Sequence, residues 1–202
     1  MVADAIFLSA SIPDPRRNPV YASTSDPIAI GAAVAGLLYV TLGRRLLVWG
    51  GHPAITPMVW AAAEDIGVEY GSWVHLYQSR YFEEDFPQEN ARFQNVTYVD
   101  AVPGDRNASL AAMRRRMLGD HELVSAVFIG GMEGVEAEFE LVRELHPTTP
   151  AFVIATTGSA ALILHGRLPD QTPELASSID YIGMFHQLLG VSATEQRRKT
   201  RN

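Results

Sequence analysis

The chain has 202 residues, 47% of them hydrophobic and 19% charged, as is usual for a globular protein with one sizeable core. Its formal charge of −7 disfavours a duplex nucleic acid as partner, because such a partner needs a cationic face. It contains no cysteine, which excludes disulfides, thiol catalysis and cysteine-based metal sites and fits a cytoplasmic location. We expect residues 1–190 to form a single domain and the basic segment 191–202 to be a flexible tail.

No segment of the sequence predicts a membrane association. The first residues lack the basic region that opens a signal peptide. The longest apolar run, residues 28–40, is shorter than the ~20 residues that cross a bilayer. We expect this run to form a buried helix, which could lie in the core or in a dimer interface.

The first hundred residues predict alternating strands and helices. The apolar stretch 5–11 is typical of a strand, and the prolines after it predict a loop that carries Arg16 and Arg17. Asp26 followed by Pro27 is a strong helix start, because Asp can cap free amides and Pro lacks one. The expected elements are then a helix over 27–41, a strand over 45–49, a helix over 56–67, a strand over 73–79, an acidic excursion loop over 82–95 and a strand over 95–100.

The second half of the chain contains the clearest unit. Residues 123–129 are a nearly continuous apolar run, typical of a strand buried on both faces. Gly130 and Gly131 end it, and a helix follows over 133–145. Around this unit the sequence predicts a helix over 108–118 capped by Asn107, a strand over 151–155, a Thr-Thr-Gly-Ser turn over 156–159, a short helix to about 164, a loop with one helical turn over 166–177 and a last helix over 178–189.

This alternation is typical of βαβ units, so we expect an α/β fold of the Rossmann-like, doubly wound kind, with a mostly parallel sheet and helices on both faces. Ligands of such folds bind outside the carboxyl ends of the strands, which here are rich in glycine and hydroxyl groups. Glycine allows sharp turns and brings amides close to a phosphate. The candidate ligand-binding residues at these ends are Ser9, Ser11, Gly50, Gly51, Gly130, Gly131, Glu133, Gly134, Glu138 and Thr157.

Three consecutive arginines, Arg114 to Arg116, lie in the helix predicted over 108–118. A helix turns ~100° per residue, so they cannot all point the same way. One of them could contact an anion at the strand ends, or all three could be solvated.

Several common chemistries lack their motifs. The sequence has no Gly-x-x-x-x-Gly-Lys-[Ser/Thr], no Gly-x-Gly-x-x-Gly and no Gly-x-Ser-x-Gly. Its six histidines are scattered without metal-ligand spacing, so no metal or other cofactor is expected. His52 follows a glycine pair and deserves notice, although a loop histidine bonded to backbone is its simplest interpretation.

Two motifs follow one another along the chain, the first in a predicted helix and the second across the end of a predicted strand. They read Met113-Arg114-Arg115-Arg116-Met117 and Ile129-Gly130-Gly131-Met132-Glu133-Gly134-Val135-Glu136-Ala137-Glu138. Together they resemble the SLOG superfamily, named for the Smf/DprA and Lonely Guy proteins, over about residues 5–165. Lonely Guy phosphoribohydrolases carry Met-x-x-Arg-Lys on a helix and then Pro-Gly-Gly-x-Gly-Thr-x-x-Glu after a central strand. By position, the resemblance implies that Arg116 and Glu138 correspond to the active-site arginine and glutamate.

The sequence departs from the Lonely Guy pattern. Ile129 replaces the proline, Val135 the threonine and Met117 the lysine, and one extra residue precedes Gly134. The looser Gly-Gly-x-x-Gly-Val-x-x-Glu form is similar to the SLOG sensor branch found beside TIR and sirtuin-like NADase domains in bacterial Thoeris-type antiphage systems. That likeness implies a receptor for cyclic ADP-ribose isomers, ADP-ribose or related NAD derivatives.

Two functions from different classes follow from the resemblance. The first is a nucleotide-signal sensor, without enzymatic activity, in which the glycine amides hold phosphates, Arg116 neutralises them and Glu138 binds ribose hydroxyls. Such a sensor would signal through oligomerisation, as a homodimer or higher homo-oligomer, or through a separate effector protein. The alternative is a nucleoside 5′-monophosphate phosphoribohydrolase, an N-glycosidase that uses Arg116 and Glu138. A module that serves only oligomerisation is a third possibility.

Overall fold

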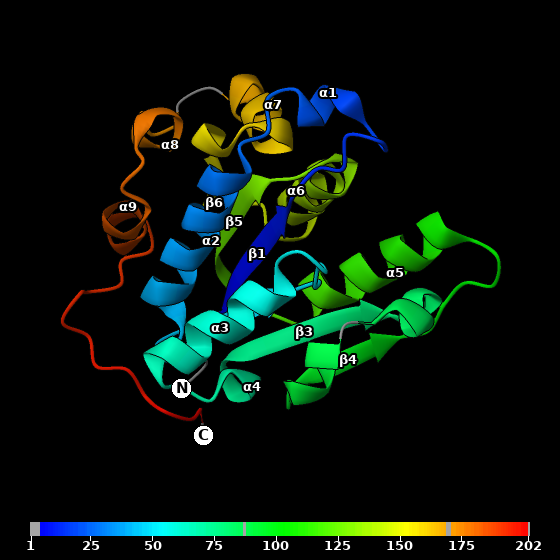
Figure 1. Cartoon of the computed structure of the whole chain (residues 1–202), viewed down its shortest axis with the longest axis horizontal. Helices are drawn as coiled ribbons and strands as arrows, with labels where there is room; N and C mark the ends of the chain where they lie inside the picture. The colour runs from blue at the N-terminus through cyan, green and yellow to red at the C-terminus, as the bar shows by residue number, and fades with distance from the viewer. Residues whose placement is uncertain (1–4, 87, 169–170, 202) are drawn as a thin grey trace.

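The computed structural model describes residues 5–86, 88–168 and 171–201. Its centre is one six-stranded sheet with the order β4-β3-β2-β1-β5-β6, in which all neighbouring pairs are parallel (Figure 1). The strands are β1 Ala5–Ser11, β2 Leu46–Trp49, β3 Val74–Ser79, β4 Val96–Val99, β5 Leu123–Gly130 and β6 Ala151–Ile154. The predicted α/β, doubly wound fold is confirmed, and the predicted strands are found with small changes at their ends.

Helices cover both faces of the sheet. One face packs against α2 Pro27–Thr41, α3 Thr56–Ile66, α8 Glu174–Ser177 and α9 Tyr181–Leu188. The other packs against α5 Arg106–Gly119, α6 Glu133–Leu145 and α7 Ser159–Arg167. Along β1, Ile6 and Leu8 enter the first core and Phe7 the second, because successive side chains of a strand point to opposite faces. Burial on both faces explains why the strands are almost continuously apolar.

The helix starts test the predicted caps. Asp26 caps α2 as predicted, accepting hydrogen bonds from the amides of Ile28 and Ala29 at 3.0 and 2.9 Å. The predicted cap of α5 is wrong. Asp105, not Asn107, holds that position and accepts from the amide of Ala108 at 2.9 Å, so the helix begins at Arg106.

Short helical segments interrupt regions that we expected to be loops. The proline-rich loop contains α1 Pro19–Ala22, and β3 is preceded by α4 Tyr70–Trp73. The acidic excursion forms two 3-10 helices, η1 Arg80–Asp85 and η2 Gln88–Arg92, and a third, η3 Ala155–Thr157, precedes α7. Each has six residues or fewer, too few for a clear periodic pattern in the sequence.

Residues 191–201 lie against the domain, in contrast to the free tail that composition predicts. Arg197 donates to the carbonyl of Leu42 at 2.7 Å, and the amide of Arg198 donates to the carbonyl of Gly43 at 2.8 Å. The Lys199 carbonyl accepts from the amide of Glu69 at 2.9 Å. These contacts with the backbone of the domain could not be foreseen from the basic composition of the segment.

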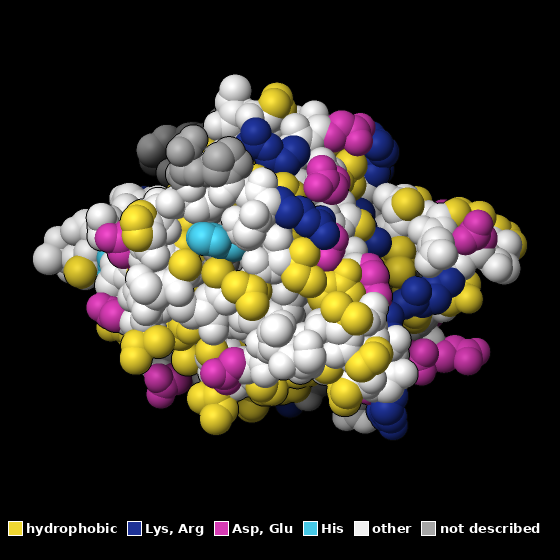
Figure 2. Space-filling model, turned by 90° about the horizontal axis from the view of Figure 1, so that it is seen from above, with side chains coloured by type: hydrophobic (Ala, Val, Ile, Leu, Met, Phe, Trp, Pro, Cys, Tyr) yellow, Lys and Arg dark blue, Asp and Glu magenta, His cyan; other side chains and the backbone are white. Residues whose placement is uncertain are grey.

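Helix α2 is less buried than its apolar sequence suggests. Ile30 and Leu37 lie in the core, whereas Ile28 is 85% exposed and Tyr39 47% exposed. None of the helices in the described ranges, α2 included, has both the length and the apolar character that crossing a bilayer requires. Viewed from above, basic and acidic side chains are interspersed over the surface (Figure 2).

Candidate functional site

A cavity of ≈ 870 Å³ opens at the carboxyl ends of the strands. The chain first winds from β1 towards β4 and then returns to the other side of β1 to form β5. The cavity lies at this reversal of strand order, which is the usual ligand position in such sheets. The predicted residues that line it are Ser9, Ser11, Gly50, Gly51, Glu133, Gly134 and Glu138. The other predicted site residues, Arg116, Gly130, Gly131 and Thr157, are not among the lining residues.

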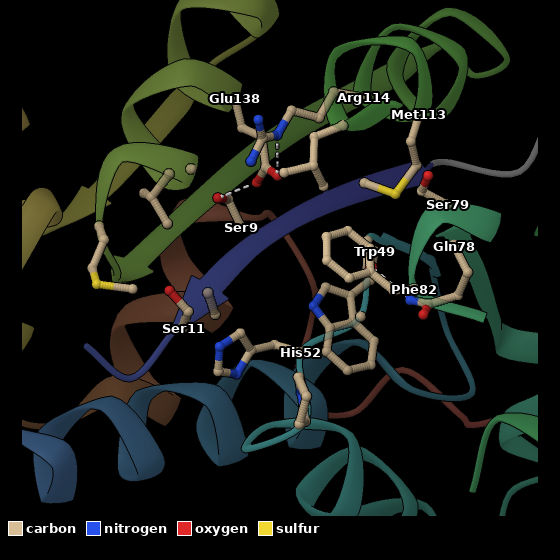
Figure 3. A pocket seen from close by; sticks show the side chains of 18 of the residues that line it. Ser9, Ser11, Trp49, His52, Gln78, Ser79, Phe82, Met113, Arg114 and Glu138 are labelled. Carbon is tan, nitrogen blue, oxygen red and sulfur yellow. Dashed lines mark hydrogen bonds and ion pairs between the residues drawn. The ribbon is translucent and has the colours of Figure 1, made fainter. Parts of the chain in front are cut away.

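Glu138 is the centre of the polar wall. Its Oε2 accepts a hydrogen bond from Ser9 Oγ at 2.5 Å, and its Oε1 pairs with Arg114 Nε at 3.1 Å (Figure 3). The side chains of Arg114 and Glu138 are only 18% and 14% exposed. Gly134 lets the guanidinium approach, because a Cβ there would lie 2.9 Å from Arg114 Nη2. The sequence therefore brings three distant segments together around one fixed carboxylate.

Arg116 does not reach this site. Its Nε pairs with Asp120 Oδ2 at 2.7 Å along the outer surface of α5, and its side chain is 62% exposed. This hydrogen bond raises the pKa of Arg116. The arginine that contacts Glu138 is Arg114, so the assignment by motif position is wrong in this structure.

The sequence of α5 gives the inward face of the helix but does not separate Arg114 from Arg116. Met113 and Met117 are one turn apart and apolar, which marks the inward face of α5, and both are buried. At ~100° per residue, Arg114 and Arg116 lie at about equal angles on opposite sides of this face, so the packing of α5 decides which of them reaches the cavity.

The glycine pair of β5 serves the fold. Gly130 N donates to Thr157 Oγ1 at 2.8 Å, and Gly131 N donates to the Ser11 carbonyl at 2.9 Å. The fully buried Thr157 hydroxyl in turn donates a hydrogen bond to the Ile154 carbonyl at 2.6 Å. Both amides are therefore used within the protein, and the expectation that they hold phosphates is not supported by this geometry. The glycines are needed because φ is +57° and +87° and a Cβ on Gly131 would overlap Val135.

The start of α6, unlike the glycine pair, faces the cavity. No side chain caps this helix at Met132. Its first amides have no acceptor inside the helix, and the residues that carry them, Met132 to Gly134, line the cavity. An anion at this position would meet the positive end of the helix dipole beside the Glu133 carboxylate, which already accepts a hydrogen bond from its own amide.

Three arginines line the cavity: Arg17 and Arg106 in addition to Arg114. Burial lowers the pKa of His52, and the charge of Arg17 lowers it further. The pKa of Glu133 is lowered by its hydrogen bond from Asn18 Nδ2, at 2.6 Å, and also by the charges of Arg17 and Arg106. The charge of Arg17 thus acts on two groups of the cavity wall. His52 Nδ1 accepts from the Ala54 amide at 3.2 Å, which agrees with the simple loop interpretation, although the residue lines the cavity.

The remaining wall is aromatic and carries two amide side chains. Trp49, Phe82 and Phe86 line the cavity together with Gln78 and Asn90. Figure 3 shows Trp49, Phe82 and Gln78 on the other side of β1 from Glu138 and Arg114. Most of these residues come from the acidic excursion, which has no motif or periodicity to single them out in the sequence.

Within the described ranges, no cluster of three or more His, Cys, Asp or Glu side chains could hold a metal ion. No curated protein and no solved structure matches the sequence significantly. A family model described as the SLOG cluster3 family matches residues 20–189, which is most of the chain. The chain therefore belongs to the SLOG cluster3 family, which indicates nucleotide-related binding or a glycosidase-like function.

Proposed function

We propose that this cavity binds a nucleotide derived from NAD, such as ADP-ribose or a cyclic ADP-ribose isomer, and that the protein acts as a sensor of that ligand. The supporting observation is that one cavity of ≈ 870 Å³ combines arginines, a fixed carboxylate and aromatic side chains. A nucleotide presents the matching groups, namely phosphates, ribose hydroxyls and a flat base. The volume lies in the usual range of about 300–1,000 Å³ for small-molecule sites.

The charged groups can be assigned to parts of such a ligand. Arg17 and Arg106 are suited to phosphates, because both bring a guanidinium charge to the cavity wall, and the positive end of the α6 dipole adds to that charge. Glu138 is suited to ribose hydroxyls. Each carboxylate oxygen can accept more than one hydrogen bond, so those made by Ser9 and Arg114 orient Glu138 without exhausting it.

The second candidate function is hydrolysis of an N-glycosidic bond with Glu138 and Arg114. The ordered carboxylate favours it, because a fixed negative charge can stabilise an oxocarbenium-like sugar. We favour binding over hydrolysis because both oxygens of Glu138 already accept hydrogen bonds, which suits a positioned acceptor better than a free general base.

A sensor needs a way to transmit the signal. We propose a homo-oligomer or a separate effector protein for this role, in a bacterial antiphage setting like that of the sensor branch which the motifs resemble. Measuring the mass of the protein by light scattering with and without ADP-ribose tests the first route. An unchanged mass would leave the effector as the only route of this proposal.

Thermal melts against ADP-ribose, cyclic ADP-ribose isomers, NAD and AMP test the binding proposal. A ligand at about one hundred times its Kd stabilises the folded state by ~2.7 kcal/mol, which raises Tm by roughly 5–10 °C for a domain of this size. Glu138→Ala should remove the shift while the unliganded protein still melts cooperatively. Release of free base from any of these nucleotides, abolished by Glu138→Ala, would establish hydrolysis instead. The absence of both shift and base release with every nucleotide would contradict both functions.

A further inference from the structure

Asn90, on η2, is a polar residue that the structure buries without satisfying it. It is 4% exposed, and its Oδ1 has no hydrogen-bond partner. Its Nδ2 makes one long hydrogen bond, of 3.4 Å, to Gln78 Oε1. An unsatisfied buried amide oxygen destabilises a fold, so its presence beside a cavity calls for a partner from outside the chain.

The neighbouring amide fixes how Asn90 is presented. Gln78 Nε2 donates to the carbonyls of Gly50 and Tyr77 at 2.8 and 3.0 Å, which turns Gln78 Oε1 towards Asn90 Nδ2. Gly51 makes room for this arrangement, because a Cβ there would overlap Gln78 Nε2. With Nδ2 held on Gln78, Asn90 cannot exchange the places of its oxygen and nitrogen without losing that bond.

The surroundings of Asn90 suit a nucleobase. Phe82 and Phe86 come from the same excursion and line the same cavity. Aromatic side chains stack on bases of any kind and supply affinity without selecting among them. Among the described polar side chains that line the cavity, Asn90 is the one that buries an unpartnered amide oxygen, so selection would depend on it.

We propose that Asn90 is a specificity-determining residue that recognises the base of the ligand, an inference that rests on the proposed nucleotide function. Its Oδ1 accepts a hydrogen bond from an exocyclic amine, and the second proton of Nδ2 is donated to the adjacent ring nitrogen. Adenine presents this donor and acceptor side by side, the pattern that asparagine reads in nucleic acids. Hypoxanthine carries a carbonyl oxygen in place of the amine and would face Oδ1 with a second acceptor.

The experiment compares ADP-ribose with its hypoxanthine counterpart, and AMP with inosine 5′-monophosphate, by equilibrium titration. We expect the wild type to prefer the adenine ligand of each pair by roughly 10- to 100-fold. Asn90→Ala should bring the ratio close to one, mainly by weakening the adenine ligand. Gln88→Ala is the matched control, because it truncates an exposed amide on the same helix, outside the cavity lining, and should keep the wild-type ratio.

The outcomes distinguish a failure of base recognition by Asn90 from a failure of the proposed nucleotide binding. Equal affinity of the wild type for both bases, or a preference that survives Asn90→Ala, would overturn the role of Asn90 and leave nucleotide binding intact. No binding of any of the four ligands by the wild type would overturn the proposed function and the base recognition with it. The circular dichroism and melting of Asn90→Ala without ligand check that its loss of preference does not come from unfolding.

Discussion

The stability of the protein should fall steeply in weak acid because of a histidine cluster at the other end of the strands from the cavity. The cluster consists of His75, Tyr77, Asp120 and His121, near the amino ends of β3 and β5. His75 Nδ1 lies 3.0 Å from His121 Nε2, which in turn lies 3.0 Å from the Tyr77 hydroxyl. The hydroxyl donates to Asp120 Oδ2 at 3.2 Å. Because the two imidazoles are in direct contact, protonating both would place two positive charges side by side, which is unfavourable.

The structure gives the direction and size of the effect. The pKa of His75 is lowered from 6.5 to about 4, mainly by burial and also by the charges of His121 and Arg201, while Asp120 raises it. Burial also lowers the pKa of His121. Below about pH 6.5 the unfolded chain therefore binds protons that the folded chain does not bind. The free energy of unfolding consequently decreases as the pH falls from about 6.5 towards 4. The full shift of His75 corresponds to about 3 kcal/mol, which its partial exposure reduces to roughly 2 kcal/mol.

Urea unfolding at pH 7 and at pH 4.5 measures this loss. His75→Leu removes the titrating group, so its stability should change less between the two pH values, although it is less stable at pH 7 for lack of the bonds to His121 and Thr97. His186→Leu on α9 is the control and should retain the wild-type pH dependence. A wild type equally stable at both pH values, or a His75→Leu variant with the full wild-type loss, would refute this reasoning.

Three further predictions concern the site and the fold. Gly131→Ala should cost about 2–4 kcal/mol, measured by chemical unfolding, because φ is +87° and the new Cβ overlaps Val135; a neutral effect would disprove the need for glycine. Asn90→Leu should leave the Tm of the unliganded protein unchanged or raise it, since it removes an unsatisfied buried amide; a fall of more than a few degrees would show that the amide is satisfied. Truncation after Val191 should cost about 2–4 kcal/mol, because Trp73 and the carbonyls of Leu42 and Gly43 lose their partners in that segment; an unchanged melt would mean that these contacts contribute nothing.

The fold could be predicted because its signals are local. The apolar run of β5, the helix pattern of α6 and the cap Asp26 each depend on a few neighbouring residues, and all are found as predicted. The cap of α5 differs from the prediction because Asp105, two residues before Asn107, also has a capping side chain and holds the position. Local preference cannot decide between them without the packing of the helix.

The site could be predicted only in part. Glu138 and the strand ends were foreseeable from motif and topology, and they do line the cavity. Whether Arg114 or Arg116 reaches the cavity depends on the rotation of α5 against the sheet. The hydrogen bond that occupies the Gly130 amide is accepted by Thr157, which lies far along the chain. Asn90 belongs to a segment without periodicity, so its burial appears only in three dimensions.

The most direct test of the central claim is a calorimetric titration of ADP-ribose into the wild type, Arg114→Ala and Arg116→Ala. Arg114 pairs with Glu138 in the cavity, whereas Arg116 pairs with Asp120 outside it, so the two variants remove the same charge from one helix at different places. We predict saturable binding to the wild type, a loss of at least tenfold in Arg114→Ala and wild-type affinity in Arg116→Ala. Binding that is lost in Arg116→Ala and kept in Arg114→Ala, or that does not occur in the wild type, would contradict the account.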